Sequence, residues 1–571
     1  MIRLTINDRN VEVLEGTTIL EAAEKINIKI PTLCYMKMSD DVSINCKGTC
    51  RVCVVEVEGQ RDLKPACSFT VKEGMKVYTN SRKAIDARRT ILKLLLSNHP
   101  NDCLNCSRNL NCELQKLARD YGVTGVTIKG ELRRKYDNST PIIRDEEKCI
   151  LCRRCVTSCC DVQNINVLTP AERGFYSFIS TFNEKLLGES DCTYCGQCVA
   201  VCPTGALQER YDYKNLINIL NENKKFTVVQ AAPSVRTALC EEFNMDVNDL
   251  TMKKIVTALK ELNFKKVFDT NFSADLTVIE EAEELIQRIK SKRNLPMFTS
   301  CCPAWVRMVE TKYPELTENL SSCKSPQQMF GAAAKAFLHK TFGINKKDMF
   351  VVSIMPCTAK KYEAEREEMK EDVDMVITTR ELARLIRLEA IDVETLEESE
   401  FDSPFGESSG AGVIFGRSGG VMEAALRTAY KRLEGENIAE NSIEFVENES
   451  GIFEGNVILD NTEIRLAYVS SLGKAQKLIE NDIKRFDFIE VMACPKGCIN
   501  GGGQPFTKGN YKILDKRLEC INNIDENSKI RVSSDNPDII KLYNRFLSYP
   551  GSLAAHEILH TKYNKYYTFK K

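Results

Sequence analysis

A repeated cysteine pattern constrains this chain more than any other feature of its sequence. The spacing C-x₂-C-x₂-C-x₃-C occurs twice, at Cys149, Cys152, Cys155 and Cys159 and again at Cys192, Cys195, Cys198 and Cys202. This spacing is typical of a fold with two [4Fe–4S] clusters, in which the fourth cysteine of each run binds the other cluster. The predicted ligand sets are therefore Cys149, Cys152, Cys155 and Cys202 for one cluster, and Cys192, Cys195, Cys198 and Cys159 for the other. The neighbouring Cys160 is interpreted as a small packing residue.

The composition agrees with a protein that is rich in metal sites. Its 571 residues include 25 cysteines but only 4 histidines. We expect a cytoplasmic protein, because no apolar run is long enough to span a bilayer and the N-terminus begins with a strand pattern. Structural disulfides are rare in that compartment, so the cysteines indicate metal sites, and the few histidines argue against zinc or haem. The net charge of −1 indicates neither a nucleic-acid partner nor a membrane surface.

The first 80 residues predict a small β-grasp domain of the ferredoxin type. Residues 3–7 and 11–14 alternate polar and apolar side chains around an expected turn at Asp8 and Arg9, which predicts a hairpin. Thr18, with Glu21 three positions later, forms a capping box, and the apolar positions that follow predict a helix. A cysteine-rich loop comes next, which is the order of elements in that fold.

Four cysteines in this region are candidates for a plant-type [2Fe–2S] cluster: Cys34, Cys50, Cys53 and Cys67. Cys50 and Cys53 have the C-x₂-C spacing that such a cluster uses. About four extra residues separate Cys34 from Cys50 when compared with the usual pattern, so Cys46 stays an alternative to Cys50. A zinc knuckle is less favoured, because these cysteines spread over more than thirty residues.

A further cluster site is predicted after a basic helix over residues 81–96. Its candidate ligands are His99, Cys103, Cys106 and Cys112. A lone histidine beside an apolar helix is usually structural, but three cysteines at short spacing favour a ligand role here. The run resembles the His-Cys₃ [4Fe–4S] site of hydrogenases and of the large NADH dehydrogenase subunit, where an imidazole replaces one thiolate. A Cys₃His zinc site is the alternative.

Residues 211–571 alternate apolar runs with amphipathic helical patterns, as over residues 252–262, which predicts an α/β domain with largely parallel sheets. Several apolar runs end at reactive or turn-forming residues, namely Pro233 and Ser234, Cys301 and Cys302, and Met355 to Cys357. Ligand sites of open α/β sheets gather beyond the carboxyl ends of the strands. The sequence therefore predicts a buried site at those strand ends.

Three cysteine motifs lie in this part of the chain: residues 299–305 (TSCCPAW), 355–360 (MPCTAK) and 492–505 (MACPKGCINGGGQP). The last has two cysteines and four glycines, which let the backbone approach a bulky group that two thiolates hold. Together the motifs offer enough thiolates for a four-cysteine iron–sulfur cubane.

With these motifs in order, the whole chain resembles an [FeFe]-hydrogenase of the long clostridial type. The resemblance implies two twisted sheets flanked by helices around an H-cluster, which is a [4Fe–4S] cubane joined by one thiolate to a di-iron unit with CO, CN⁻ and a bridgehead amine. It implies the reaction 2H⁺ + 2e⁻ ⇌ H₂. The cofactors expected in total are one [2Fe–2S], three accessory [4Fe–4S] clusters and the H-cluster.

The resemblance also implies roles for individual residues. The expected cubane ligands are Cys302, Cys357, Cys494 and Cys498, with Cys498 as the bridge to the di-iron unit. The expected contacts of the di-iron unit are Lys360, Pro233 and Ser234 at its cyanides, and Gln327, Met355, Phe415 and Met492 around its CO groups. Taken alone, the apolar members are typical core residues. Lys496 stands between two ligands where the family usually has glycine, and its effect stays open.

A proton path is implied in the same way. Its residues are expected to be Cys301, Glu281, Ser321, Glu284 and Arg288. A thiol is able to donate and accept a proton near neutral pH. By sequence alone the glutamates belong to an acidic run, residues 280–284, that would otherwise be interpreted as a solvated helix face.

The fold class expected is multidomain, α+β and α/β. The domains are residues 1–80 (β-grasp [2Fe–2S] ferredoxin-like), 81–125 (His-Cys₃ [4Fe–4S]), 126–210 (bacterial two-[4Fe–4S] ferredoxin-like) and 211–571 (H-cluster domain). The activity implied is that of a ferredoxin hydrogenase. The partners implied are ferredoxin or flavodoxin as electron donor and the H-cluster maturation proteins, and the expected state is a monomer. An electron-transfer subunit of a bifurcating or NADH-linked complex, or an iron–sulfur H₂ sensor, are the alternatives. Residues 410–416 nearly match the dinucleotide-binding fingerprint but miss its G-x-G-x-x-G spacing by one residue. Direct nicotinamide binding is therefore disfavoured.

Overall fold

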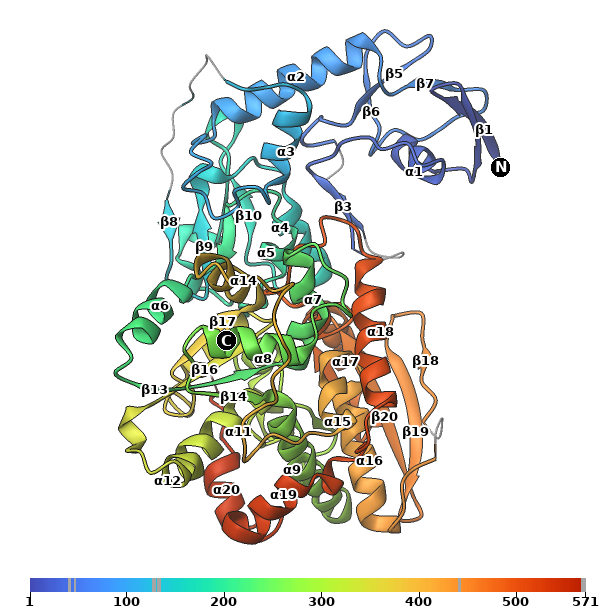
Figure 1. Ribbon diagram of the computed structural model, residues 1–571. Coiled ribbons are helices and arrows are strands. Elements are labelled where there is room, and N and C mark those ends of the chain that lie inside the picture. Colours follow the sequence, from blue (N-terminus) through green and yellow to red (C-terminus); the bar gives the residue numbers. More distant parts are fainter. Residues whose placement is uncertain (39–42, 46–47, 126–129, 131–134, 440–442, 566–571) are drawn as a thin grey trace.

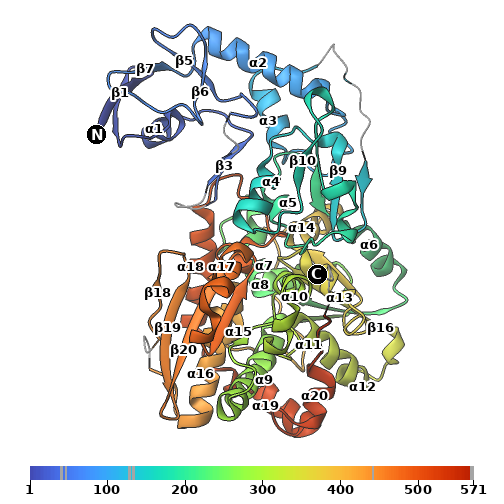
Figure 2. The same cartoon turned by 180° about the vertical axis from the view of Figure 1, so that it is seen from behind.

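The computed structural model describes residues 1–38, 43–45, 48–125, 130, 135–439 and 443–565. Within these ranges, no helix is both long enough and apolar enough to cross a membrane. Figures 1 and 2 show a small N-terminal sheet at one end, a middle region of short elements, and a large α/β body at the other end.

The N-terminal sheet has five strands in the order β2-β1-β7-β5-β6. These are β1 (Ile2–Ile6), β2 (Arg9–Val13), β5 (Val54–Val57), β6 (Lys64–Pro65) and β7 (Lys76–Tyr78), with α1 (Ile19–Lys25) after β2. A hairpin, a helix and a parallel β1–β7 pair are the features of the predicted β-grasp fold. Strands β3 (Tyr35–Lys37) and β4 (Ser43–Asn45) form a separate hairpin.

Two local predictions in this sheet have different outcomes. The capping box of Thr18 and Glu21 is confirmed, with both of its hydrogen bonds present. The predicted turn was wrong by one residue, because Asn7 and Asp8 occupy it, with φ of 48° and 63°. A tight turn of this kind needs positive φ at both central positions, which Asn and Asp accept more easily than Arg9 does.

The middle region consists of short elements around the cysteine motifs. Helices α2 (Arg82–Ser97) and α3 (Glu113–Asp120) lead into it, and Ser81 caps the first of them. A three-stranded sheet follows in the order β12-β9-β8. The remaining short elements are β8 (Tyr136–Asp137), β9 (Ile142–Asp145), α4 (Arg154–Thr157), β10 (Thr169–Ala171), β11 (Phe178–Ser180), α5 (Gln197–Val201) and β12 (Leu207–Glu209).

The α/β body contains two sheets. The first is fully parallel, in the order β14-β13-β16-β17: β13 (Phe226–Ala231), β14 (Lys266–Asp269), β16 (Met349–Met355) and β17 (Met375–Thr378). The second is mixed, in the order β15-β21-β20-β19-β18: β15 (Met297–Phe298), β18 (Val446–Glu447), β19 (Phe453–Leu459), β20 (Thr462–Ser470) and β21 (Phe488–Met492). Strand β16 is apolar and buried along most of its length, as expected for a parallel strand covered on both faces.

Helices lie around both sheets and between them (Figures 1 and 2). They include α6 (Tyr213–Glu222), α7 (Pro233–Glu242), α8 (Met252–Glu261), α9 (Thr270–Ser291), α10 (Pro303–Lys312), α11 (Pro326–Ala333), α13 (Ala359–Ala364), α14 (Thr379–Leu388), α15 (Gly410–Val413), α16 (Gly420–Glu434), α17 (Leu472–Asp482), α18 (Ile513–Glu526), α19 (Pro537–Leu542) and α20 (Leu553–Leu559). The long α9 is buried over most of its length and contacts α11, α15 and α16. The predicted fold class, with ferredoxin-like regions and a two-sheet α/β domain, is confirmed.

Candidate active site and cluster sites

A cavity lies where the strands of both sheets end. Strand β16 ends at Met355 and β21 ends at Met492, while Pro233 begins α7 shortly after β13. Cys302 precedes α10, a few residues after β15. The space not filled by atoms is about 820 Å³. The prediction that a site forms beyond the carboxyl ends of the strands therefore matches the geometry.

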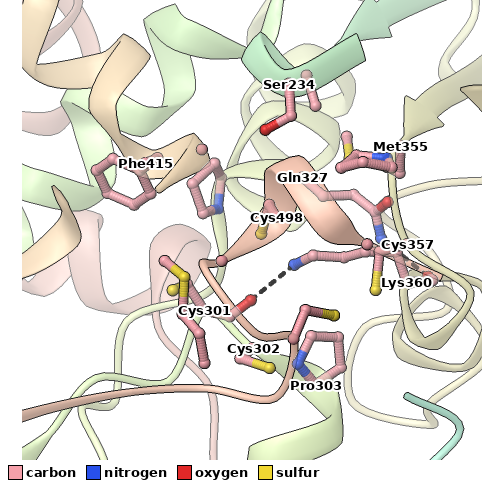
Figure 3. Close-up of a pocket in the computed structure, with 18 of the residues that line it drawn as sticks. Ser234, Cys301, Cys302, Pro303, Gln327, Met355, Cys357, Lys360, Phe415 and Cys498 are labelled. Carbon is pink, nitrogen blue, oxygen red and sulfur yellow. Dashed lines mark hydrogen bonds between the residues drawn. The ribbon is translucent and has the colours of Figure 1, made fainter. Parts of the chain in front are cut away.

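The predicted H-cluster residues line this one cavity. They are Cys302, Cys357, Cys494, Cys498, Cys301, Lys360, Pro233, Ser234, Gln327, Met355, Phe415 and Met492. Figure 3 shows Phe415, Ser234, Met355 and Gln327 around the same space as three of the cubane cysteines. Segments as far apart in the sequence as residues 233 and 498 thus line the same cavity.

The donor set fits an iron–sulfur cluster better than a single ion. A tetrahedral zinc ion bound at about 2.3 Å holds its sulfur ligands roughly 3.8 Å apart. Among the described residues, no set of three or more cysteines brings its sulfur atoms within 4.8 Å of one another. Soft thiolates at wider separation, in a largely apolar cavity, match the requirements of a cubane with a further metal unit beside it.

Two polar atoms on the cavity wall also fit a bound group. Ser234 Oγ and Gln327 Oε1 are buried and have no hydrogen-bond partner in the protein. A buried polar atom without a partner is unfavourable, so these atoms are suited to ligands of the di-iron unit. Gly416 keeps the wall open, because a Cβ there would lie 2.6 Å from Ser234 Oγ and 2.3 Å from the Ile521 side chain.

Lys360 lines the cavity, and two acceptors hold its ammonium group. Its Nζ donates to the backbone oxygen of Cys301 at 3.0 Å (Figure 3) and to the Glu363 carboxylate at 2.9 Å. Burial is the largest single influence and lowers the pKa of Lys360, but the charge and hydrogen bonds of Glu363, together with the nearby Cys301 and Cys357, outweigh it, so the net shift is upward. The ammonium is therefore charged and fixed in position. Glu363 was missed from the sequence, although its i,i+3 spacing from Lys360 was a usable signal.

The predicted proton-path residues form a connected set behind Cys301. Ser321 Oγ donates to Glu284 Oε2 at 3.2 Å, and Arg288 binds the other Glu284 oxygen at 2.6 Å. Glu281 is 1% exposed, and one of its carboxylate oxygens has no hydrogen-bond partner. Burial, and then the Glu284 charge, raise the pKa of Glu281 to about 8.

Cys301 faces the cavity at the inner end of this set. Burial raises the pKa of its thiol, the Glu281 charge adds to the rise, and the Lys360 ammonium opposes it. The solvated interpretation of the acidic run is wrong for Glu280 and Glu281, because α9 turns both carboxyls into the protein. Glu284 is partly buried and paired with Arg288.

The accessory cysteines lie in separate cavities that match the predicted ligand sets. One cavity is lined by Cys149, Cys152, Cys155 and Cys202, a second by Cys159, Cys192, Cys195 and Cys198, and a third by His99, Cys103, Cys106 and Cys112. The crossing of the fourth cysteine is thus present in the fold. Cys160 stays outside these cavities, and its thiol contacts the backbone oxygen of Leu168 at 3.6 Å.

In the N-terminal region, the Cys34 thiol lies within hydrogen-bonding reach of Cys50 and Cys67, and Cys67 lies within reach of Cys53. All four are buried. Cys46, the alternative to Cys50, falls outside the described residues. Lys496 points away from the cavity and pairs with Asp515 at 2.6 Å near the surface.

One accessory site touches the main cavity directly. Cys195 lines both the accessory cavity and the main one. Thr358 Oγ1, beside Cys357, donates to the Tyr194 backbone oxygen at 2.8 Å. Gly502 lies so close that a Cβ there would be 2.7 Å from the Gly196 Cα. The predicted cluster of the Cys192 run and the predicted cubane are therefore separated only by these loops.

Buried contacts also connect the other cysteine sites. Arg108 Nη2 donates to the Cys202 backbone oxygen at 3.0 Å, next to the His99 site. Arg154 joins the N-terminal region to the middle one, because it donates to the Tyr35 backbone oxygen at 2.9 Å and to Glu113 at 2.8 Å. The cysteine sites thus form a continuous series through the molecule.

Comparison with protein families finds matches along nearly the whole chain. Residues 225–502 match "Iron only hydrogenase large subunit, C-terminal domain", and residues 511–566 match "Iron hydrogenase small subunit". The N-terminal matches are a 2Fe-2S cluster binding domain (residues 1–82), the iron–sulfur binding region of NADH-ubiquinone oxidoreductase-G (88–127) and a 4Fe-4S dicluster domain (148–206).

Similar proteins agree with these family matches. NADP-reducing hydrogenase subunit HndD of Solidesulfovibrio fructosivorans is 45% identical, over 99% of each chain. Iron hydrogenase 1 of Clostridium pasteurianum is 40% identical, over 99% of this chain and all of its own. The structure of [FeFe]-hydrogenase HydA1 from Chlamydomonas reinhardtii is 39% identical, with a TM-score of 0.56, and covers 62% of this chain and 98% of its own.

The fold, the cavity and these similarities define the class of protein. The chain belongs to the [FeFe]-hydrogenase family, and it is an iron–sulfur oxidoreductase with hydrogenase function. Its iron–sulfur domains are of both the 2Fe-2S and the 4Fe-4S kinds.

Proposed function

We propose that the chain catalyses 2H⁺ + 2e⁻ ⇌ H₂ at an H-cluster held by Cys302, Cys357, Cys494 and Cys498, with Cys498 shared with the di-iron unit. When bound, the group supplies an open iron and a basic amine, where protons and electrons combine. The observation that carries the proposal is that all four cysteines, Cys301 and the fixed Lys360 ammonium line one cavity.

The residues around the cavity bind and orient the di-iron unit. Lys360 offers a charged donor for a cyanide, and the unpaired Ser234 Oγ is suited to the other, beside Pro233. Gln327 donates to Glu363 and to the Lys360 backbone oxygen, which fixes its amide on the cavity wall, where it would contact the CO groups of a bound di-iron unit. Met355, Phe415 and Met492 are buried and exclude water from the reacting centre.

Proton transfer is assigned to Cys301, Glu281, Ser321, Glu284 and Arg288. A buried carboxyl with a pKa of about 8 holds or releases a proton near neutral pH, which suits Glu281 to the step between Cys301 and Ser321. Ser321 is hydrogen-bonded to Glu284, whose charge Arg288 balances close to the surface. This path argues against a sensor that has lost turnover, because a sensor does not need rapid proton transfer.

Electrons are assigned to a series of clusters. We propose one [2Fe–2S] cluster at Cys34, Cys50, Cys53 and Cys67, and three accessory [4Fe–4S] clusters on the sets described above. The Cys192 set, with Cys195 beside the main cavity, serves as the last carrier before the H-cluster. The same proposal keeps the four domains at residues 1–80, 81–125, 126–210 and 211–571.

Two electron partners remain candidates. A reduced ferredoxin or flavodoxin, with the chain acting as a monomer, follows from the resemblance to the long clostridial type. A subunit assembly that exchanges electrons with NADP is favoured by one observation, the 45% identity with a protein named as a subunit of an NADP-reducing hydrogenase.

The test measures H₂ formation by the anaerobically purified chain, assembled with the maturation proteins. Reduced ferredoxin alone is expected to support turnover. If H₂ forms only when NADPH and a flavin-containing partner subunit are both added, the assembly replaces the ferredoxin proposal. A control with dithionite and a small dye separates a failed partner from a failed catalyst.

A further inference from the structure

A second cluster of ligating side chains lies at the outer end of the proposed proton path. Glu284, Cys323 and His560 each offer one ligand atom, and these atoms all lie within 4.8 Å of one another. Cys323 Sγ contacts Glu284 Oε2 at 3.7 Å. Among the described residues, this is the group that meets the spacing needed by a single metal ion. It combines sulfur, nitrogen and oxygen donors.

The backbone holds two of these residues side by side. Cys323 and His560 are partners in an isolated antiparallel bridge. The bridge is flanked by hydrogen bonds from Lys324 N to Leu559 O and from Thr561 N to Ser322 O, both 2.8 Å long. Glu284 projects from α9 onto the same point, where it accepts a hydrogen bond from Ser322 N at 2.9 Å. The donor set is therefore built into the fold.

Glu284 and His560 line an outer cavity, Cys323 is buried beside them, and several carboxylates surround the cluster. A cavity with about 660 Å³ of open space is lined by Glu284, His560, Ser322 and Glu280, among others. Glu280 Oε2 lies 3.0 Å from His560 Nε2, and His556 lies against the His560 ring. Arg288 and Arg293 are the arginines on this cavity wall, and Arg288 binds the Glu284 oxygen that is not in contact with Cys323.

We propose that a divalent cation of the zinc class binds to Glu284, Cys323 and His560 and thereby inhibits proton transfer. A borderline-soft ion accepts thiolate, imidazole and carboxylate together, whereas Mg²⁺ and Ca²⁺ prefer oxygen ligands only. The fourth coordination position of the ion faces the outer cavity and is occupied by water. Cys323 binds as the thiolate, and its proton leaves to solvent through that cavity.

The inhibition follows from the place of Glu284, and this part rests on the proposed function. Glu284 Oε2 accepts the hydrogen bond from Ser321, so an ion on that oxygen occupies the lone pairs that a passing proton needs. The ion would also join two parts of the chain, since His560 lies in the segment that matches the small subunit and the other two ligands lie in the large-subunit segment.

The test uses the full-length holoenzyme and adds Zn²⁺. We expect the wild-type protein to bind one zinc ion more than Cys323→Ala, and zinc X-ray absorption to show one sulfur with nitrogen and oxygen neighbours. His560→Gln serves as a second variant in case Cys323→Ala folds poorly. Cys520→Ala, a thiol on α18 outside the proton path, is the matched control and is expected to bind zinc as the wild type does.

Turnover is measured in parallel, with each variant compared with its own rate without zinc. Zinc is expected to inhibit the wild type and Cys520→Ala reversibly, while Mg²⁺ does not, and at least tenfold more zinc is needed for Cys323→Ala. Equal zinc binding by the wild type and both site variants overturns the proposal. Binding without inhibition overturns the inhibitory role and the place of Glu284 in the path. Lack of turnover before zinc is added would instead be a failure of the proposed function.

Discussion

At the scale of single residues, burial gives Cys301 and Glu281 properties that their types do not have in water. Both lie inside the protein, where the charged form of a thiol or carboxyl is disfavoured, so the pKa of each is raised. Each therefore keeps its proton near neutral pH and is able to pass it on. Lys360 and Glu363 form the opposite case, a charged pair that stabilises both ions in the same dry surroundings.

Cys301→Ser is expected to retain the assembled H-cluster and to lose most H₂ turnover. A hydroxyl is a far weaker acid than a thiol, so the first proton transfer slows, by about 10²–10⁴-fold if it acts as a general acid and base. The measurement combines cluster content with H₂ formation, and Cys520→Ser is the control. Turnover near that of the wild type, with full cofactor content, would remove Cys301 from the proton path.

The protonation of Glu281 should be visible directly. Because its pKa is raised to about 8 in the folded protein, the carboxyl is protonated at about pH 6 and ionises as the pH rises through about 8. The pKa values of Glu490 and Asp275 are raised too, so the Glu281 band is identified as the protonated-carboxyl intensity that the wild type has and Glu281→Gln lacks. This difference band is expected at the lower pH and absent at about pH 10. A band that is already lost near pH 5 would mean that burial does not raise this pKa.

The same shift affects stability with a definite sign. Between about pH 4.5 and pH 8 the folded protein binds the Glu281 proton more tightly than the unfolded chain, so this group's contribution to the free energy of unfolding falls as the pH rises. The stabilising contribution of Glu281 is complete below about pH 4.5 and is lost as the pH rises through about 8.

At the scale of elements, the loops between the accessory and main cavities decide how close the clusters lie. Gly196 and Gly502 bring two backbones together. Cys195 lies directly before Gly196 and Cys498 lies on the same loop as Gly502, and both cysteines line the main cavity. A side chain on either glycine has no room beside the facing backbone.

Gly502→Ala is expected to separate the two loops. Its Cβ would lie 2.7 Å from Gly196 Cα and 2.9 Å from the Cys195 backbone oxygen, so the backbone must move, at about 1–3 kcal/mol of stability. We expect a lower melting temperature and slower turnover with an electron donor that enters through the accessory clusters. Gly125→Ala, with open space around it, is the control. If Gly502→Ala behaves like Gly125→Ala in both measurements, the contact does not limit electron delivery.

Sequence reasoning was strongest where the signal is local. The cysteine runs predicted sets of residues that the fold brings together, because cluster ligands on short loops leave a fixed spacing. The capping box and the strand ends of the α/β body were predictable for the same reason. The hairpin turn was displaced by one residue, since the pattern of alternation does not report which residues accept positive φ.

Long-range pairings could not be predicted from the sequence. Nothing near Cys323 indicates that it pairs with His560, and the acidic run of residues 280–284 does not reveal that α9 buries Glu280 and Glu281. Lys496, between Cys494 and Cys498, gave no signal of its direction, and in the structure it pairs with Asp515. The roles of the cavity residues came from the family resemblance and not from periodicity.

At the scale of the whole molecule, the cysteine sites converge on one buried cavity. The N-terminal site connects through Arg154, and the His99 site connects through Arg108, to the same Cys149 set. The Cys192 set lies between that point and the main cavity. The N-terminal site and the His99 site are therefore two separate candidate entry points for electrons, which suits either a single small donor or a larger assembly.

The measurement that tests the central claim most directly is an infrared spectrum in the region of metal-bound CO and CN⁻. The protein is produced anaerobically with the maturation proteins, and its cubane content is measured in the same sample. Our account predicts CO and CN⁻ bands that shift when H₂ is added. The absence of such bands, in protein whose four cavity cysteines hold a cubane, would contradict it and would leave a chain of clusters without a catalyst.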